Sequence, residues 1–257
     1  MTVRAKKSLG QHFLVDENLL GVVARLAELD PDDVVLEVGP GLGVLTRYLA
    51  DRVRLVHAVE LDRELEEPLR SALGGHENVK LVFGDALRLD LASLEPAPTK
   101  LVSNLPYNVA TPLVVESLRW STTLERWCVM VQREVGDRFF AKPGTKAYGA
   151  VSVLVQLQTR RIGFRRVPPT AFRPRPRVES ALVAFERVGE RMSTRVRSLV
   201  DAAFAHRRKT LANSVAFAGL ATRADAERAL EAIGFSRRAR AEELAPDRFV
   251  ALAEELG

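Results

Sequence analysis

A short segment near the middle of the chain places an amide, a proline and an aromatic ring close together. Residues 103–108 read SNLPYN and follow the short apolar run at 101–102. The residue before a proline is disfavoured in the α conformation, so Leu105 should be extended and the next helix should begin after this turn. Asn104 and Tyr107 would then project from the end of a strand. The same pattern also fits a plain strand-to-helix turn.

A glycine-rich turn lies earlier in the chain, at the end of another predicted strand. Residues 37–43 read EVGPGLG and open a helix, where glycines allow backbone amides to approach a ligand closely. A dinucleotide fingerprint requires glycine at position 44, and Val44 stands there, which disfavours NAD. The E-x-G-x-G-x-G spacing is typical of class I S-adenosylmethionine-dependent methyltransferases. A purely structural glycine turn would look similar.

Two acidic residues follow the next two predicted strands. A carboxylate at Glu60 can accept hydrogen bonds from both hydroxyls of a ribose, and Asp85 is placed to accept one from the exocyclic amine of an adenine. Either acid alone could be a solvated strand end. Because both follow consecutive strands at their carboxyl ends, together they predict a nucleoside site.

The elements that must position these residues alternate along the first two thirds of the chain. Short β-branched runs separated by helical patterns indicate βαβ units and a mostly parallel, Rossmann-like sheet, which places the chain in the α/β class. The predicted strands are 34–38, 55–59, 80–83, 101–102, 127–131, 151–157 and 181–185.

Beyond about Gly189 the pattern is helical only. Thr222 and Asp225 fit a capping box, Gly234 a helix stop and Pro246 a helix start. We therefore expect a catalytic domain at 1–187 and a small all-helical domain at 188–257.

The composition is that of a folded, basic protein. The 257 residues are 47% hydrophobic and carry a formal net charge of +5, so the surface favours polyanions. Residues 160–177 contain no acidic residue, which indicates an edge that faces phosphates. The arginines in this stretch are Arg160, Arg161, Arg165, Arg166, Arg173, Arg175 and Arg177.

Other classes of protein are disfavoured by what the sequence lacks. The single cysteine, Cys128, excludes an internal disulfide framework and fits a reducing cytoplasm, and the four histidines show no metal-binding spacing. No apolar run approaches the roughly 18 residues of a membrane span, and no signal peptide is recognisable. We expect a cytoplasmic protein without a metal.

The ordered motifs, taken together, resemble one family along essentially the whole chain. This family is the KsgA-type ribosomal RNA adenine N6-dimethyltransferases, to which the erythromycin-resistance methyltransferases are close relatives. The matching blocks are KKSLGQHFL at 6–14, LEVGPGLGVLT at 36–46, AVELD at 58–62, GDAL at 84–87, SNLPYN at 103–108, AKPGTKAYGAVSVLVQ at 141–156, PPTAFRPRPRVESALV at 168–183 and FAHRRKTLANS at 204–214.

The resemblance implies S-adenosylmethionine as the cofactor, a seven-stranded sheet, and a cofactor lid and helix within residues 1–30. It assigns contacts with the methionine part to the glycine turn, with the ribose to Glu60 and with the adenine to Asp85. His12 occupies a place where many members carry asparagine. The implied cofactor-binding residues are Gln11, His12, Leu14, Gly39, Gly41, Glu60, Leu61, Asp85, Ala86 and Asn104.

The resemblance also gives the SNLPYN segment a chemical role. Asn104 and the Leu105 carbonyl would accept the two N6 hydrogens of a target adenine, and Pro106 would hold both acceptors in position. Tyr107 would lie against the base and Phe172 would stack on its opposite face. On this basis, alanine at Asn104 or Phe172 should leave folding intact and abolish methyl transfer.

By the same resemblance, the substrate is 16S rRNA in a precursor of the small ribosomal subunit, where two adjacent adenines of the 3′-terminal hairpin are dimethylated by a monomer. A 23S rRNA methyltransferase of the macrolide-resistance type is one alternative, and a non-catalytic RNA- or DNA-binding factor is another. The intact SNLPYN segment disfavours the second. The expected RNA contacts are Arg160, Arg161, Arg165, Arg166, Arg173, Arg175, Arg207, Arg208 and Lys209.

Overall fold

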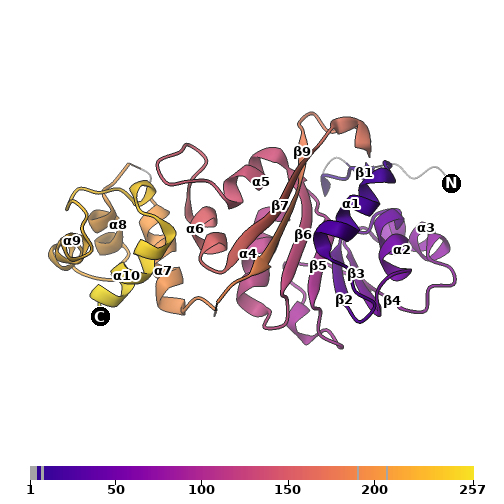
Figure 1. The fold of residues 1–257 in the computed structure, drawn as a ribbon, viewed down its shortest axis with the longest axis horizontal. Helices are drawn as coiled ribbons and strands as arrows, with labels where there is room; N and C mark the ends of the chain where they lie inside the picture. Colours follow the sequence, from indigo (N-terminus) through magenta and orange to yellow (C-terminus); the bar gives the residue numbers. More distant parts are fainter. Residues whose placement is uncertain (1–4, 7–8, 190, 207) are drawn as a thin grey trace. The chain divides into compact units, whose positions relative to one another are not determined.

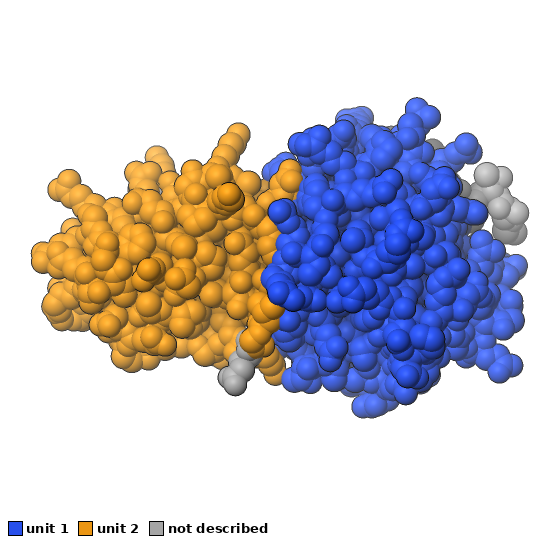
Figure 2. All heavy atoms as spheres, in the orientation of Figure 1, with its two compact units in different colours: residues 1–136, 160–187 blue, residues 137–159, 188–257 orange. Residues whose placement is uncertain are grey.

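The computed structural model describes residues 5–6, 9–189, 191–206 and 208–257. Two compact units are distinguished by their internal packing (Figure 2): residues 1–136 with 160–187, and residues 137–159 with 188–257. Residues 137–159, which we expected within the larger domain, therefore pack with the helices of the second unit. Within the described part of the chain, no helix has the length and apolar character that crossing a bilayer requires.

A seven-stranded sheet forms the centre of the first unit (Figure 1). The pairs β4–β3, β3–β2, β2–β5 and β5–β6 are parallel, and β6–β9 is antiparallel. The predicted mostly parallel sheet is therefore confirmed. In spatial order the strands are β4 (Val79–Phe83), β3 (Leu55–Glu60), β2 (Val34–Val38), β5 (Lys100–Asn104), β6 (Arg126–Gln132), β9 (Ser180–Arg187) and β7 (Thr159–Val167).

Helices cover the sheet and bury its apolar strands. Strand β2 is buried along its whole length, as expected for a central parallel strand with both faces covered. Leu20 and Val23 of α1 belong to the same hydrophobic cluster as Leu49 of α2. The helices before the second unit are α1 (Asn18–Ala27), α2 (Val44–Ala50), α3 (Glu66–Ala72) and α4 (Ala110–Trp120), and α5 (Arg133–Phe139) follows β6.

The expected strand at 151–157 is wrong, because this segment forms helix α6 (Ala150–Gln156). A short run of β-branched apolar residues suits a buried helix as well as a strand, and only tertiary packing separates the two. Ser152 favours the helix, since its hydroxyl accepts a hydrogen bond from the Gly149 N–H at 3.2 Å and donates to the Arg138 carbonyl at 2.6 Å. The seventh strand of the sheet is instead β7. Its arginines interrupt the apolar pattern by which the other strands were predicted.

The second unit is helical beyond residue 188. It contains α7 (Thr194–Phe204), α8 (Leu211–Phe217), α9 (Arg223–Ala232) and α10 (Pro246–Glu255). The predicted start signals are confirmed, because the Thr222 side chain accepts a hydrogen bond from the Asp225 N–H and Pro246 is the first residue of α10. The Phe204 ring contacts the rings of Tyr148 and Phe249, with centroid distances of 6.0 and 5.8 Å.

A two-stranded ladder joins the N-terminal arm, residues 5–6 and 9–14, to the connector after β7. Strand β1 (Phe13–Leu14) pairs antiparallel with β8 (Phe172–Arg173), with Leu14 opposite Phe172. This pairing turns the Phe172 side chain into the hydrophobic cluster, where it is 0% exposed. The expectation of a Phe172 ring open to a substrate base is therefore corrected: the ring is part of the core.

This burial also reverses the expected behaviour of Phe172→Ala. Removing a fully buried ring should lower the free energy of unfolding by about 3–5 kcal/mol through lost transfer energy and a residual cavity. Urea denaturation measures the change. The matched control is Phe217→Ala, whose side chain is 71% exposed and whose loss should change stability by less than about 0.5 kcal/mol. Equal stability of the Phe172 variant and the wild type would contradict this assignment.

Candidate active site

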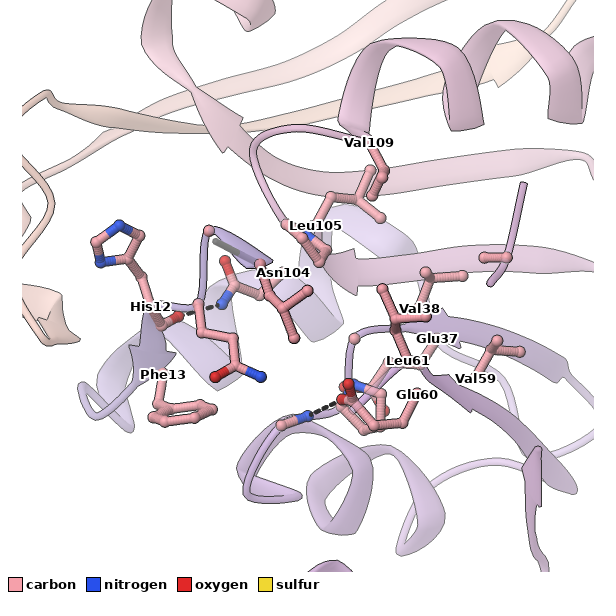
Figure 3. Close-up of a pocket in the computed structure, with 18 of the residues that line it drawn as sticks. His12, Phe13, Glu37, Val38, Val59, Glu60, Leu61, Asn104, Leu105 and Val109 are labelled. Atoms are coloured by element: carbon pink, nitrogen blue, oxygen red, sulfur yellow. Dashed lines mark hydrogen bonds between the residues drawn. The ribbon is translucent and has the colours of Figure 1, made fainter. Parts of the chain in front are cut away.

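The carboxyl ends of four parallel strands and the N-terminal arm line one pocket of the first unit (Figure 3). It encloses about 970 Å³, including solvent at its mouth, and lies where open α/β sheets bind ligands. The pocket is lined by the glycine turn, by the residues at the carboxyl ends of β2, β3, β4 and β5, and by the arm.

The glycine turn depends on the absence of side chains. Gly39 and Gly41 have φ values of 78° and 60°, in the left-handed region that favours glycine. A Cβ added at Gly39 would lie 3.0 Å from the Pro106 ring, and one at Gly41 would lie 2.8 Å from Cδ1 of Phe13. The turn is thus held closely between the SNLPYN segment and the arm, and larger residues would displace one of them.

Polar contacts fix the arm beside the end of β3. The Lys6 ammonium pairs with Asp62 at 2.7 Å and with Glu64 at 2.9 Å. The Gln11 amide nitrogen donates to Asp62 at 3.0 Å, and its oxygen accepts from the Lys6 N–H at 2.8 Å. Burial alone would raise the pKa of Asp62, but the hydrogen bonds from Lys6 and Gln11 outweigh it and lower the pKa. Gln11 lines the pocket while both ends of its amide hold the arm.

Glu60 is buried, and both of its carboxylate oxygens accept backbone hydrogen bonds. Oε2 accepts from the Gly41 N–H at 3.1 Å (Figure 3), and Oε1 accepts from the Asp62 N–H at 2.9 Å. Burial raises the pKa of this carboxyl, and the backbone bonds oppose the rise. The carboxylate is therefore fixed in direction, at the junction of the glycine turn and β3.

A second buried acid, Glu37, lies at the end of β2 and was not among the predicted site residues. Burial raises its pKa to about 8, the nearby Thr46 hydroxyl opposes the rise and the Glu60 charge adds to it. Oε2 of Glu37 is buried and has no hydrogen-bond partner among the described residues. Glu37 is the first residue of the E-x-G-x-G-x-G pattern, and this position could have identified it as a site residue.

The SNLPYN segment directs defined atoms at the pocket. The Asn104 amide nitrogen donates to the His12 carbonyl at 3.0 Å (Figure 3), which leaves its oxygen turned away from the arm. Leu105 is held by its N–H, which donates to the Met130 carbonyl at 3.0 Å. The Tyr107 hydroxyl shares a 2.6 Å hydrogen bond with Ser180, and its ring lies 5.2 Å from that of His12.

The structure brings nearly all of the predicted catalytic and cofactor-binding residues to this pocket. Those that line it are Gln11, His12, Leu14, Gly39, Gly41, Glu60, Leu61, Asp85, Ala86, Asn104, Leu105, Pro106 and Tyr107. Phe172 does not. Sequence reasoning missed Phe13, Glu37 and Asp62, each of which lies inside a motif that pointed to its neighbours. The described residues contain no group of three or more His, Cys, Asp or Glu side chains that could hold a metal ion.

The predicted RNA-contacting arginines of the first unit lie on β7 and the connector after it. Their side chains are exposed at Arg160, Arg161, Arg165, Arg166, Arg173 and Arg175. Arg160 pairs with Glu186 at 2.5 Å, so part of its charge is neutralised within the sheet. In the second unit Arg208 and Lys209 are exposed, and Arg207 lies outside the described residues.

Comparison with known proteins decides the family. The family model for ribosomal RNA adenine dimethylase matches residues 2–256. The chain belongs to this family. A relative from Rubrobacter xylanophilus, named ribosomal RNA small subunit methyltransferase A, is 49% identical over 253 residues, which is 98% of this chain and 95% of the relative.

Two solved structures resemble this member of the ribosomal RNA adenine dimethylase family. The 23S rRNA methyltransferase ErmE is 30% identical, with a TM-score of 0.70 over 95% of this chain and 99% of that one. A dimethyladenosine transferase from Plasmodium falciparum is 21% identical, with a TM-score of 0.78 over 94% and 96% of the two chains. The second likeness establishes a shared fold.

The buried acid at Glu37 predicts a pH-dependent stability for this family member. Its folded-state pKa of about 8 exceeds the ordinary 4.5, so the folded state retains a proton that the unfolded state releases between these values. Wild-type stability should therefore fall as pH rises through this window. Glu37→Gln has no proton to lose, so its stability relative to wild type should increase from about pH 5 to about pH 8.

Urea denaturation at both pH values measures this effect. The matched control is Glu77→Gln at an exposed position, which should leave the pH dependence as in the wild type. Parallel pH profiles for Glu37→Gln and the wild type would show that the Glu37 carboxyl is ionised throughout.

Proposed function

We propose that this chain transfers methyl groups from S-adenosylmethionine to N6 of adenine in the 16S rRNA of the small ribosomal subunit. One observation carries the proposal: Asn104 opens into the same pocket as the glycine turn, Glu60 and Asp85, in a chain of the ribosomal RNA adenine dimethylase family. A nucleoside cofactor and a target amine would thus meet in one space.

The residues of the pocket fit this cofactor. S-adenosylmethionine supplies an electrophilic methyl group on a cationic sulfur and also carries an ammonium group. The buried Glu60 carboxyl suits a positively charged ligand, and Oε2 of Glu37 is a buried oxygen without a described partner. A bound cation would favour ionisation of Glu37, whose pKa burial raises to about 8. In this proposal the glycine turn holds the methionine part, Glu60 accepts from the ribose hydroxyls and Asp85 accepts from the adenine amine.

The SNLPYN segment would activate the target amine by orienting it. The lone pair of adenine N6 is delocalised into the ring, so a geometry that localises it promotes attack. The Asn104 oxygen and the Leu105 carbonyl accept the two N6 hydrogens and direct the lone pair towards the methyl group. Orientation of this kind can supply about 7–11 kcal/mol of a barrier at best. The proton leaves to solvent after transfer.

The remaining contacts of the base come from one aromatic ring. Tyr107 would lie against the adenine, and its hydroxyl, bonded to Ser180, keeps the ring in place. Stacking contributes roughly 1–3 kcal/mol per base. No matching role is proposed for Phe172, because its ring is in the core.

We further propose that the two adjacent adenines of the 3′-terminal hairpin are the target and that a monomer acts on a small-subunit precursor in the cytoplasm without a metal. The name and 49% identity of the Rubrobacter relative favour the small subunit over the 23S substrate of ErmE, at 30%. The intact residues 104–107 argue against a factor that only binds nucleic acid.

Labelled cofactor tests these alternatives directly. Tritiated S-adenosylmethionine incubated with undermethylated small subunits should yield labelled N6,N6-dimethyladenine, while large-subunit RNA should remain unlabelled. Label confined to large-subunit RNA would support the resistance-type activity, and absence of label from both would support a binding factor.

Asn104→Ala tests the proposed mechanism. Loss of a fixed acceptor for the target amine should lower methyl transfer roughly 100-fold or more in single-turnover assays at saturating cofactor. Asn108→Ala is the matched control, because this exposed amide lines the same pocket and has no proposed role, so most activity should remain. Turnover of the Asn104 variant within about twofold of wild type would remove this residue from the mechanism.

A further inference from the structure

The ring of Phe217 at the end of α8 lies largely in solvent. At 71% exposure it is the most exposed of the large hydrophobic side chains in the described part of the chain. Helix α8 buries Leu211, Ala212 and Val215. At about 100° per residue, position 217 falls on roughly the opposite side of the helix. The register of α8 therefore holds this ring away from the core.

Cationic and aromatic groups surround the exposed ring. The Lys209 ammonium lies 4.3 Å from the ring centroid, and the His206 ring makes an edge contact at 4.9 Å with an interplanar angle of 87°. A cation at this distance is attracted to the face of the ring and restricts its motion. The neighbouring Arg208 is exposed, and no described acidic residue forms an ion pair with Arg208 or Lys209.

An unpaired nucleotide matches this arrangement. Single strands are bound by aromatic rings that stack on bases and by cations that contact the adjacent phosphates. Duplex RNA keeps its base faces covered and is recognised through its shape and backbone. A single exposed ring is ordinary on a protein surface, but a ring in contact with a cation and next to a further exposed arginine is suited to a polyanion with flat, accessible bases.

A protein partner fits the same surface less well. Protein-binding patches are contiguous and apolar over several hundred Å². In this part of the unit Leu220 is the other large hydrophobic side chain that is exposed, and Arg208 and Lys209 add positive charge. The charge and the small apolar area both favour RNA.

We propose that Phe217, with Lys209 and His206, forms a stacking site for an unpaired base of RNA. The inference rests on the proposed function, because an RNA substrate is its premise. It adds to the expected basic contacts a residue that binds the base itself, so this unit would distinguish single-stranded from paired RNA.

Fluorescence anisotropy with the full-length protein tests the site. The probes are labelled single-stranded oligoadenylate and oligouridylate and a duplex of the same length. Phe217→Ala and Phe217→Leu should weaken single-strand binding by roughly 5- to 150-fold, the equivalent of about 1–3 kcal/mol for one stacked base. Phe217→Trp should retain the affinity, since it keeps an aromatic face. Duplex affinity should change by less than about twofold for all three variants.

Salt dependence separates stacking from charge. Phe217→Ala removes no charge, so its slope of log affinity against log salt should equal that of the wild type. Lys209→Ala should reduce the slope by about 0.7 if this ammonium contacts one phosphate of a single strand.

Three outcomes would overturn the inference. The first is equal single-strand binding by Phe217→Ala and the wild type, and the second is no single-strand binding by the wild type. The third is a loss of affinity of Phe217→Ala for small ribosomal subunits with no loss for isolated RNA, which would assign the ring to a protein contact. None of these assays requires methyl transfer. A wild type that binds RNA through Phe217 but labels no adenine would therefore refute the proposed function and leave this site intact.

Discussion

The hydrogen bond from the Asn104 amide nitrogen to the His12 carbonyl fixes the orientation of the Asn104 amide in the pocket. It joins the end of β5 to the N-terminal arm, residues that are 92 positions apart in the chain. An amide can present either donors or an acceptor to a ligand, depending on its rotation. Because the bond to the arm fixes which end of the amide is the nitrogen, it also fixes the side on which the oxygen lies, and this oxygen is free to accept from a substrate. The proposed chemistry requires this acceptor.

Two buried acids, Glu37 and Glu60, line the same pocket. Glu37 and Glu60 are both buried, and burial of an ionised carboxyl is unfavourable unless it is paired. Glu60 is compensated by two backbone N–H groups, whereas Oε2 of Glu37 has no described partner. A cationic ligand would offset this cost. A bound cation would also favour the ionised form of Glu37, whose pKa burial raises to about 8.

Sequence patterns predicted the parts of the site that depend on strand order. The carboxyl ends of parallel strands meet at one edge, so the glycine turn, Glu60 and Asp85 could be brought together from their spacing alone. The family resemblance added Asn104. The patterns failed where tertiary packing decides. Residues 151–157 suit either a helix or a strand, and the burial of Phe172 follows from a two-residue ladder too short to leave a periodic signal.

The arm and the arginine-rich connector form one mechanical element. Leu14 pairs with Phe172, and the His12 ring is bonded to the Pro174 carbonyl at 2.6 Å, while the His12 carbonyl accepts the bond from Asn104. A shift of the connector backbone at 172–174 must therefore be shared by residues 12–14. In the proposed function, RNA bound at Arg173 or Arg175 that displaced this backbone would change the hydrogen bond that orients the Asn104 amide, so substrate binding and amide orientation would be coupled through His12.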